Sequence, residues 1–403
     1  MLSQIRPIAT AISINDKVVT YEQLAALVEK QTKLLDNQLR IKSEMTLDFI
    51  VNVLAALQSK VPVIIYPKEY EKNIDTEIKN LHPDCSLVLL TSGSSGESKF
   101  VQLSIENIQA NIDAITLSLD FDSVESQVLF LPLSYSFGLI GQLLTALSLG
   151  KTTYLADHFI KIKKIVQDNK VNMISAVPSH FPSIIKLLDN NSSLTHIISA
   201  GAFLSSDLRS NLSEAFPNAV LYNNYGQTEI GPRALSMNSR NKNFFSDSTG
   251  YPVKGIKFRI VDQMIEFKGR QIMLGYLNSD SPVDKDGWLK TGDKASECDG
   301  LITILGRADD LVQIDGKRVS LIKLKVDIAN ILNRKGVALI QDSDLRVLCF
   351  IESSLTRQEH SELILRLSLN IPYSNFLVIS SIPYLANGKV DFAALKMNIN
   401  SKF

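Results

Sequence analysis

The chain has 403 residues, of which 45% are hydrophobic and 21% are charged, and its formal net charge is zero. This length predicts two or three structural units with a large core. The balanced charge provides no global field for nucleic acid or an anionic membrane, so we expect neither as a partner. Three cysteines and five histidines are scattered without a metal-binding spacing, which indicates free thiols in a cytoplasmic protein. No apolar run reaches the length of a membrane span, so we expect no membrane anchor.

Predicted helices and strands alternate through the first half of the chain. An amphipathic helix is predicted over residues 20–35, with Thr20 as its N-cap. Its apolar side carries Leu24, Leu27, Val28 and Leu35. The next predicted elements are a helix at 47–57, strands at 61–66 and 87–90, and a helix capped by Ser104. Three strand–helix pairs follow, at 128–131 with 137–149, 173–177 with 181–188, and 196–199 with 206–216. This order predicts an α/β sheet covered by helices.

The pattern changes after about Ser239. Short strands with Gly-rich turns are predicted between residues 250 and 306. Asp315-Gly316 then separates two strand-like runs, which is typical of a β-hairpin. Predicted helices at 322–334 and 357–369 and strands at 337–351 and 375–380 complete the chain. The predicted fold is therefore α/β: a large N-terminal α/β domain over residues 1–306, with a β-rich subdomain at about 245–306, and a small α+β domain over residues 310–403.

The segment TSGSSGESK at residues 91–99 follows the apolar run at 87–90. Its glycines permit tight turns with uncovered backbone N–H groups, and its hydroxyls and Lys99 add donors. This composition is typical of a phosphate-binding loop. It is not the P-loop NTPase pattern, because Lys99 is not preceded by Gly and is followed by Phe100.

Four further segments occur in a fixed order: NNYGQTEIGPR at 223–233, TGD at 291–293, GRADDLVQIDGKR at 306–318 and YLANGKVD at 384–391. With these five motifs the chain resembles the adenylate-forming superfamily of acyl-CoA and aryl-CoA ligases, nonribosomal peptide synthetase adenylation domains and luciferase. The resemblance runs from Val19 to Asp391. It implies that a carboxylate attacks the α-phosphate of ATP, giving acyl-AMP and pyrophosphate. A phosphopantetheine thiol of CoA or of an acyl or peptidyl carrier protein then accepts the acyl group, and the C-terminal domain is mobile.

The resemblance also implies roles for individual residues. Thr228 would contact the α-phosphate, Glu229 would bind Mg²⁺, and Lys389 would bridge the carboxylate and the α-phosphate. Tyr225 would face adenine, while Asp293 and Arg307 would lie at the ribose; Asp309 would be the hinge. The other expected ATP- or AMP-binding residues are Thr91, Ser92, Gly93, Ser94, Ser95, Gly96, Lys99, Gly201, Ala202, Asn224 and Gly226. Taken alone, Tyr225 could equally be a core aromatic, and Glu229 and Lys389 solvated surface residues.

The acyl pocket is expected to include Tyr135, Phe137, Ala176 and Val177, although core packing explains the two aromatic residues equally well. No Asp occurs between Pro132 and Gln142 to pair with a substrate ammonium, which favours an acid without an α-ammonium group. Lys323 and Lys325 favour an acidic acceptor, or simply form a solvated helix face.

Two alternatives stay open: a stand-alone amino-acid adenylation protein, and a nucleotide-binding homologue without catalysis. The second is motivated by the short N-terminal lobe, because only about ninety residues precede the phosphate-binding loop. This puts in doubt any pocket wall or dimer surface that the family builds there.

Overall fold

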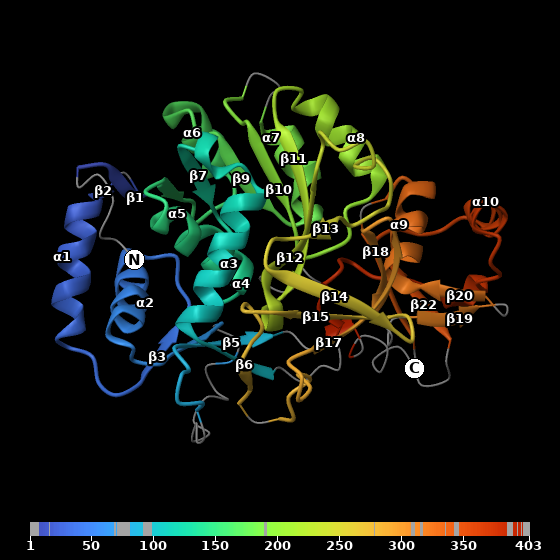
Figure 1. Cartoon of the computed structure of the whole chain (residues 1–403). Helices are drawn as coiled ribbons and strands as arrows, with labels where there is room; N and C mark the ends of the chain where they lie inside the picture. Colours follow the sequence, from blue (N-terminus) through green and yellow to red (C-terminus); the bar gives the residue numbers. More distant parts are fainter. Residues whose placement is uncertain are drawn as a thin grey trace.

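The computed structural model describes residues 8–15, 17–67, 70, 81–91, 99–188, 192–277, 279–307, 311–314, 317–334, 336–341, 346–384, 390–392, 394, 395 and 397. Among these residues, nine strands form the largest sheet (Figure 1). In spatial order they are β13 (Tyr251–Pro252), β12 (Gly231–Asn238), β11 (Val220–Gln227), β10 (His196–Ser199), β9 (Met173–Ala176), β7 (Ser126–Leu129), β8 (Thr152–Leu155), β1 (Thr10–Ile14) and β2 (Lys17–Thr20).

The centre of this sheet is parallel and covered by helices, as the alternating pattern predicts. Strands β9, β10 and β11 run parallel, and every residue of β7, β9 and β10 is buried. Hydrophobic contacts join α3 to one face, whereas α6, α7 and α8 pack against the other. The helices of this part are α1 (Tyr21–Thr32), α2 (Leu47–Ser59), α3 (Ile105–Ser118), α4 (Ser136–Gly138), α5 (Thr145–Ser148), α6 (Lys161–Asn169), α7 (Phe181–Leu187) and α8 (Ser206–Ala215).

Two smaller sheets complete the N-terminal part. Five strands form one of them within the described chain: β16 (Gly275–Tyr276), β6 (Lys99–Leu103), β5 (Leu87–Thr91), β4 (Val63–Tyr66) and β3 (Leu39–Lys42). The other is antiparallel and contains β14 (Ile256–Val261), β15 (Met264–Gly269), β17 (Leu289–Cys298) and β18 (Leu301–Arg307). It corresponds to the β-rich region predicted at 250–306, and the predicted α/β class is confirmed.

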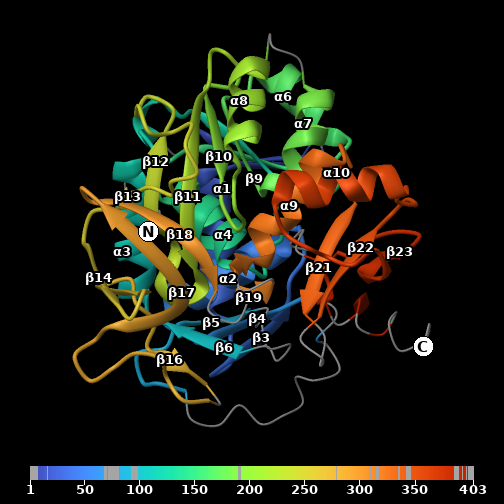
Figure 2. The ribbon, with the colours of Figure 1, turned by 90° about the vertical axis from the view of Figure 1, so that its right-hand side faces the viewer.

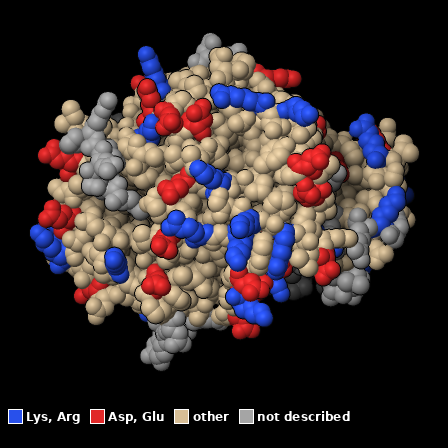
Figure 3. All heavy atoms as spheres, in the orientation of Figure 1, with Lys and Arg blue, Asp and Glu red and all other residues tan. Residues whose placement is uncertain are grey.

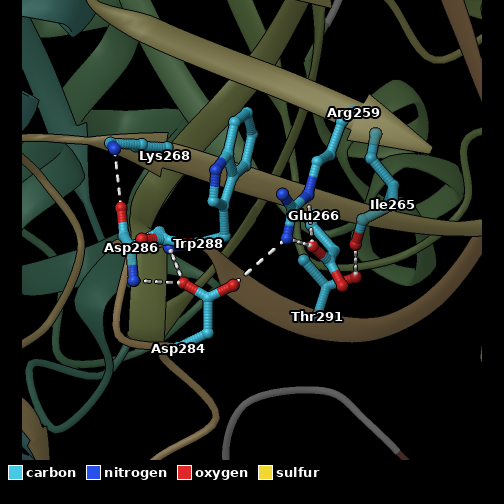
Figure 4. Close-up of polar contacts among 8 residues, drawn as sticks. All are labelled: Arg259, Ile265, Glu266, Lys268, Asp284, Asp286, Trp288 and Thr291. Atoms are coloured by element: carbon cyan, nitrogen blue, oxygen red, sulfur yellow. Dashed lines mark hydrogen bonds and ion pairs between the residues drawn. The ribbon is translucent and has the colours of Figure 1, made fainter. Parts of the chain in front are cut away.

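A polar cluster in this antiparallel sheet supports the start of β17 (Figure 4). Arg259 Nε donates to Glu266 Oε2 at 2.6 Å, and Arg259 Nη2 donates to Asp284 Oδ2 at 3.1 Å. The guanidinium also lies 4.4 Å from the ring centroid of Trp288, the residue before β17. These contacts hold the turn at residues 284–288 against β14 and β15. They thereby position the strand that carries Asp293.

The C-terminal elements have hydrophobic clusters of their own. The hairpin β19 (Leu311–Ile314) and β20 (Lys317–Ser320) is followed by α9 (Leu321–Ile331), β21 (Val337–Gln341), β22 (Val347–Ile351), α10 (Arg357–Leu367) and β23 (Phe376–Val378). All members of their two buried clusters lie between residues 312 and 395. Figure 2 shows this unit beside β17 and β18. Asn330 of α9 donates to Asp207 of α8 at 2.9 Å, which joins the unit to the large sheet's helices.

Two details differ from the sequence-based expectations. The predicted helix at 137–149 is interrupted, because residues Leu139–Leu144 form a π-helix between α4 and α5. Leu27 was expected on the apolar side of α1, but its side chain is 39% exposed; Leu24 and Val28 alone of the predicted stripe are fully buried. The buried apolar stripe of α1 is narrower than predicted, because α1 packs mainly against one neighbour, α2.

The surface in Figure 3 mixes Lys and Arg with Asp and Glu, consistent with the zero net charge. No helix in the described ranges has both the length and the apolarity to cross a membrane. All three cysteines are unpaired, with Cys85 and Cys349 buried and Cys298 exposed.

Candidate functional site

The Asp293 carboxylate is where three of the sequence motifs meet. The Tyr225 hydroxyl at the end of β11 donates to Asp293 Oδ2 at 2.5 Å, and Gln227 Nε2 donates to the same oxygen at 2.8 Å. Gln227 Nε2 also donates to the carbonyl of Thr291 at 3.1 Å. Burial, and then the negative charge of Asp293, raise the pKa of Tyr225 well above its ordinary value, so the hydroxyl remains a donor. The motifs NNYGQTE and TGD, about seventy residues apart, therefore form one polar group.

Arg307, from the third motif, lies opposite Asp293 across the β17–β18 pair. Its Nη1 is 3.9 Å from Asp293 Oδ1, at the outer limit of an ion pair, and its side chain is 37% exposed. Gly292, beside Asp293, has φ +77°. A Cβ at Gly292 would lie 2.9 Å from Arg307 Nη2, so glycine permits both the left-handed turn and the approach of the guanidinium.

Glu229 and Lys99 form a second group, connected by Tyr276. The Tyr276 hydroxyl donates to Glu229 Oε1 at 2.8 Å, and Lys99 Nζ lies 4.7 Å from the centroid of the Tyr276 ring. Burial and the charge of Glu229 raise the pKa of Tyr276. Lys99 pairs directly with Thr91 across the β5–β6 hairpin. The two ends of the predicted phosphate-binding loop are thus paired with each other, and Tyr276 connects one of them to Glu229.

Thr228 lies between these two groups in sequence and faces α4. Its Oγ1 is 3.4 Å from Ser136 Oγ. Gly226, two residues earlier, is packed against β12: a Cβ there would lie 2.4 Å from the Pro232 carbonyl carbon and oxygen. The backbone of residues 232 and 233 in β12 therefore lies directly beside Gly226 of the NNYGQTE motif.

The other predicted site residues lie around the ends of β9, β10 and β11. Asn224 is buried and its Nδ2 donates to the Ser199 carbonyl at 3.3 Å. Gly201 follows β10 with φ +84°, and a Cβ there would lie 3.3 Å from Val177 Cγ1. Ala202 is exposed, whereas Ala176 belongs to the core beneath the helices. In α4 and the residue before it, Tyr135 and Phe137 are half-buried.

Several predicted residues lie outside the described ranges. They are Ser92, Gly93, Ser94, Ser95 and Gly96 of the phosphate-binding loop, the hinge residue Asp309, and Lys389. Their roles stay predictions. Of the two lysines discussed in α9, Lys325 is partly buried, and burial lowers its pKa; Lys323 is outside the part whose side chains are described.

Gln227, Tyr276 and Ser136 were not predicted as site residues. Gln227 lies inside the NNYGQTE motif, so the motif pointed to its position. Nothing in the sequence indicated that its side chain would contact Asp293. Tyr276 and Ser136 reach Glu229 and Thr228 only through the pairing of β16 with β6 and the placement of α4.

Glu229 suits a magnesium ion whose other ligands are mainly water and substrate phosphates. No group of three or more His, Cys, Asp or Glu side chains in the described residues could form a complete metal cage. Glu229 offers a carboxylate whose Oε1 is oriented by Tyr276. Mg²⁺ is commonly bound by one or two carboxylates together with water and substrate phosphates, so this donor set fits.

Comparison with known proteins gives a consistent result. The family model for "AMP-binding enzyme" matches residues 15–277. The chain is 30% identical to the 4-coumarate–CoA ligase of Pinus taeda over 324 residues, which cover 68% of this chain and 60% of that one. It is 26% identical to the D-alanine–D-alanyl carrier protein ligase of Lactococcus lactis subsp. lactis (strain IL1403), over 84% of this chain and 73% of the relative.

The fold is also similar to that of solved structures. The o-succinylbenzoate CoA synthetase of Bacillus subtilis, in complex with an acyl-adenylate intermediate, superposes with a TM-score of 0.81 at 19% identity, covering 98% of this chain and 96% of the other. By contrast, the alignments span only 45–60% of the length of the 4-coumarate–CoA ligases that it matches.

Proposed function

Because the chain belongs to the AMP-binding enzyme family of adenylate-forming enzymes, we propose that it activates a carboxylic acid with ATP. The carboxylate oxygen forms a bond to the α-phosphorus, the bond to the β-phosphate oxygen breaks, and acyl-AMP and pyrophosphate result. In the second half-reaction a phosphopantetheine thiol attacks the acyl carbon and AMP leaves. The thiol belongs to CoA or to a carrier protein.

The observation that carries the proposal is the arrangement around Asp293. Its carboxylate is buried, is oriented by Tyr225 and Gln227, and lies beside Arg307. A carboxylate accepts hydrogen bonds at both oxygens, and ribose hydroxyls are suitable donors to it. With the ribose at Asp293, Tyr225 would lie at the edge of the nucleoside site and its ring would border the adenine.

The polyphosphate belongs on the opposite side, between the Gly/Ser loop and Glu229. Thr91 and Lys99 are paired at the base of that loop, and Lys99 supplies a positive charge there. Thr228 lies in sequence between Gln227 and Glu229, and its hydroxyl would donate to the α-phosphate. A Mg²⁺ ion at Glu229 would neutralise phosphate charge. Most of the rate enhancement is expected from such positioning and charge stabilisation.

Lys389 completes the proposed catalytic set. A lysine that bridges the attacking carboxylate and the α-phosphate would stabilise charge present only in the transition state. It belongs to the predicted domain at residues 310–403, which follows the proposed hinge at Asp309, so this domain would present it for adenylation and withdraw it for thiol transfer.

The test is ATP–pyrophosphate exchange with a panel of carboxylic acids, followed by CoA or a phosphopantetheinylated carrier protein. We expect one class of acid to support exchange, AMP to be the stoichiometric product, and a thioester to appear by mass spectrometry with one of the two acceptors. Stoichiometric ADP would refute the proposal, because it requires attack at the γ-phosphate.

A second candidate is activation of an amino acid for a carrier protein. The similarity to a D-alanine–D-alanyl carrier protein ligase over 84% of this chain favours it. Against it, residues 133–141 contain no Asp to pair with a substrate ammonium. D-alanine and L-amino acids therefore belong in the panel, and exchange restricted to them would establish this candidate.

A further inference from the structure

Among the residues that the structure describes, two arginine side chains are fully buried, and they differ in how their donors are satisfied. Arg209 and Arg233 both have 0% exposed surface. Arg209 donates to four backbone carbonyls at 2.5–3.0 Å, which belong to Leu204, Phe244, Ser246 and Ser248. Its charge is thus surrounded by carbonyl dipoles, as a structural role requires.

Arg233 in β12 has no comparable set of acceptors. Within the described part of the chain, its Nε and Nη1 atoms have no hydrogen-bond partner. Burial lowers its pKa to about 9, and no neighbouring charge among those residues offsets this effect. The guanidinium is therefore still cationic at neutral pH, and a buried charge without an anion carries a large free-energy penalty.

The guanidinium lies next to the residues assigned to the acyl pocket. Its Cζ is 5.3 Å from the centroid of the Phe137 ring, and its Nη1 would be 2.9 Å from a Cβ at Gly141. Phe137 follows Ser136, whose hydroxyl is 3.4 Å from that of Thr228. The cation therefore packs against a ring whose neighbour in sequence contacts Thr228, the residue proposed to contact the α-phosphate.

The surrounding segment has further unsatisfied polar atoms. Gly141 and Gln142 belong to the π-helix at Leu139–Leu144, a conformation that often occurs at functional sites. Gln142 Oε1 and Asn111 Oδ1 are buried without partners among the described residues. Asn111 Nδ2 donates to the Arg233 carbonyl at 3.3 Å, which places this side chain beside β12. Water could satisfy such N–H and C=O groups, but only an anion neutralises the guanidinium.

We propose that Arg233 is the counter-ion for a second acidic group of the substrate, so that the chain activates a dicarboxylic acid. One carboxylate would react at the α-phosphate, while the other would receive the guanidinium in the bidentate geometry that arginine and carboxylates favour. The Phe137 ring would cover the carbon chain between them. This inference rests on the proposed function, whose acyl pocket it specifies. It also disfavours an amino-acid substrate, because an ammonium at this position would face a cation.

The test compares diacids with monoacids that differ only in the second charge. Malonic, succinic, glutaric and adipic acids and their monomethyl esters are assayed in ATP–pyrophosphate exchange. For the preferred length, we expect kcat/KM to be about 10- to 100-fold higher for the diacid, the range for losing one charge-assisted interaction. In Arg233→Met this preference disappears while KM for ATP is unchanged. Arg233→Lys retains part of it, because the charge stays but the bidentate geometry is lost.

Thermal stability provides a readout that does not require catalysis. With a non-hydrolysable ATP analogue present, the preferred diacid should raise the melting temperature of the wild type but not that of Arg233→Met. Without acid, Arg233→Met should melt at the same or a higher temperature, since it removes an unpaired buried charge. Arg240→Met, at a side chain that is 67% exposed, is the control and should behave as the wild type does.

The outcomes separate the inference from the proposed function. Exchange with monoacids at the diacid rate, unaffected by Arg233→Met, overturns the inference and leaves acid adenylation intact. A diacid-dependent thermal shift that needs Arg233, without exchange, supports the subsite and overturns the catalytic proposal. Absence of both exchange and thermal shift with every acid overturns both. Should Arg233→Met not fold, Arg233→Lys serves for the same comparisons.

Discussion

Replacing Asp293 by asparagine tests the nucleoside side of the site. The variant has the same shape and retains an acceptor for the Tyr225 hydroxyl and Gln227 Nε2. It removes the negative charge, so hydrogen bonds that were charge-assisted become neutral. A charge-assisted bond contributes about 1.5–3 kcal/mol and a neutral one about 0.5–1.5 kcal/mol. We therefore expect each ribose hydroxyl to lose about 1–1.5 kcal/mol of binding free energy.

Two ribose hydroxyls give a total of about 2–3 kcal/mol, which corresponds to about a 30- to 150-fold higher Kd for ATP. Arg307 contributes little to this change in binding free energy, because its charge is partly exposed and 3.9 Å from Asp293 Oδ1. Calorimetric titration with ATP, without an acid substrate, measures the change. A melting curve of the variant checks that it folds.

Comparing ATP with 2′,3′-dideoxy-ATP in both proteins shows whether the loss of affinity comes from the ribose hydroxyls. The wild type should lose more affinity for the dideoxy compound than Asp293→Asn does, by about 30- to 150-fold, because the variant has only the weaker neutral bonds to lose. Asp299→Asn is the matched control, because this exposed carboxylate lies in the turn between β17 and β18 of the same sheet. If Asp293→Asn discriminates between the two nucleotides as strongly as the wild type does, Asp293 does not contact the ribose.

Three further predictions concern chemistry, pH and packing. Lys389→Ala should lower the rate of ATP–pyrophosphate exchange by about two to three orders of magnitude, the scale for losing a preorganised charge. The control Lys254→Ala, at an exposed lysine, should change this rate less than twofold. Equal rates in the two variants would show that Lys389 is not a catalytic residue. Burial lowers the pKa of His196, so the unfolded chain binds a proton that the folded chain does not, and stability should fall as the pH drops below about 6.5. Urea unfolding between pH 7 and pH 5 should show a weaker pH dependence in His196→Gln, and an identical slope would contradict this explanation. Gly226→Ala should destabilise the protein by about 1–3 kcal/mol, because the added Cβ meets the Pro232 backbone at 2.4 Å; an unchanged urea midpoint would show that β12 relaxes instead.

Local signals in the sequence predicted helix starts well. Thr20 and Ser104 were expected as N-caps, and the side chain of each accepts a hydrogen bond from the backbone three residues later. In return, their backbone N–H groups donate to the side-chain oxygens of Gln23 and Asn107. Such caps depend only on neighbouring residues, so no tertiary information is needed. The π-helix at Leu139–Leu144 carried no such signal, because its apolar composition fits a regular buried helix equally well.

Site residues could be predicted where they lie inside a recognisable motif. They could not be predicted where the contact forms only after two distant strands pair. Tyr225, Glu229 and Asp293 were named from their motifs. The contact between Tyr276 and Glu229 depends on β16 pairing with β6, which joins residues about 175 positions apart. Arg233 stood inside the NNYGQTEIGPR motif, yet its importance depends on burial without an acceptor, a property that only the packed structure has.

The separate cores of the two units have a genetic consequence. Tyr225, Gln227 and Arg307 contact Asp293 from positions before residue 308, and the buried clusters of the C-terminal unit begin at Val312. A stop codon after residue 307 would therefore remove Lys389 but keep these three residues and the cores of the N-terminal part. Such an allele is expected to encode a nucleotide-binding protein that lacks the proposed catalytic lysine.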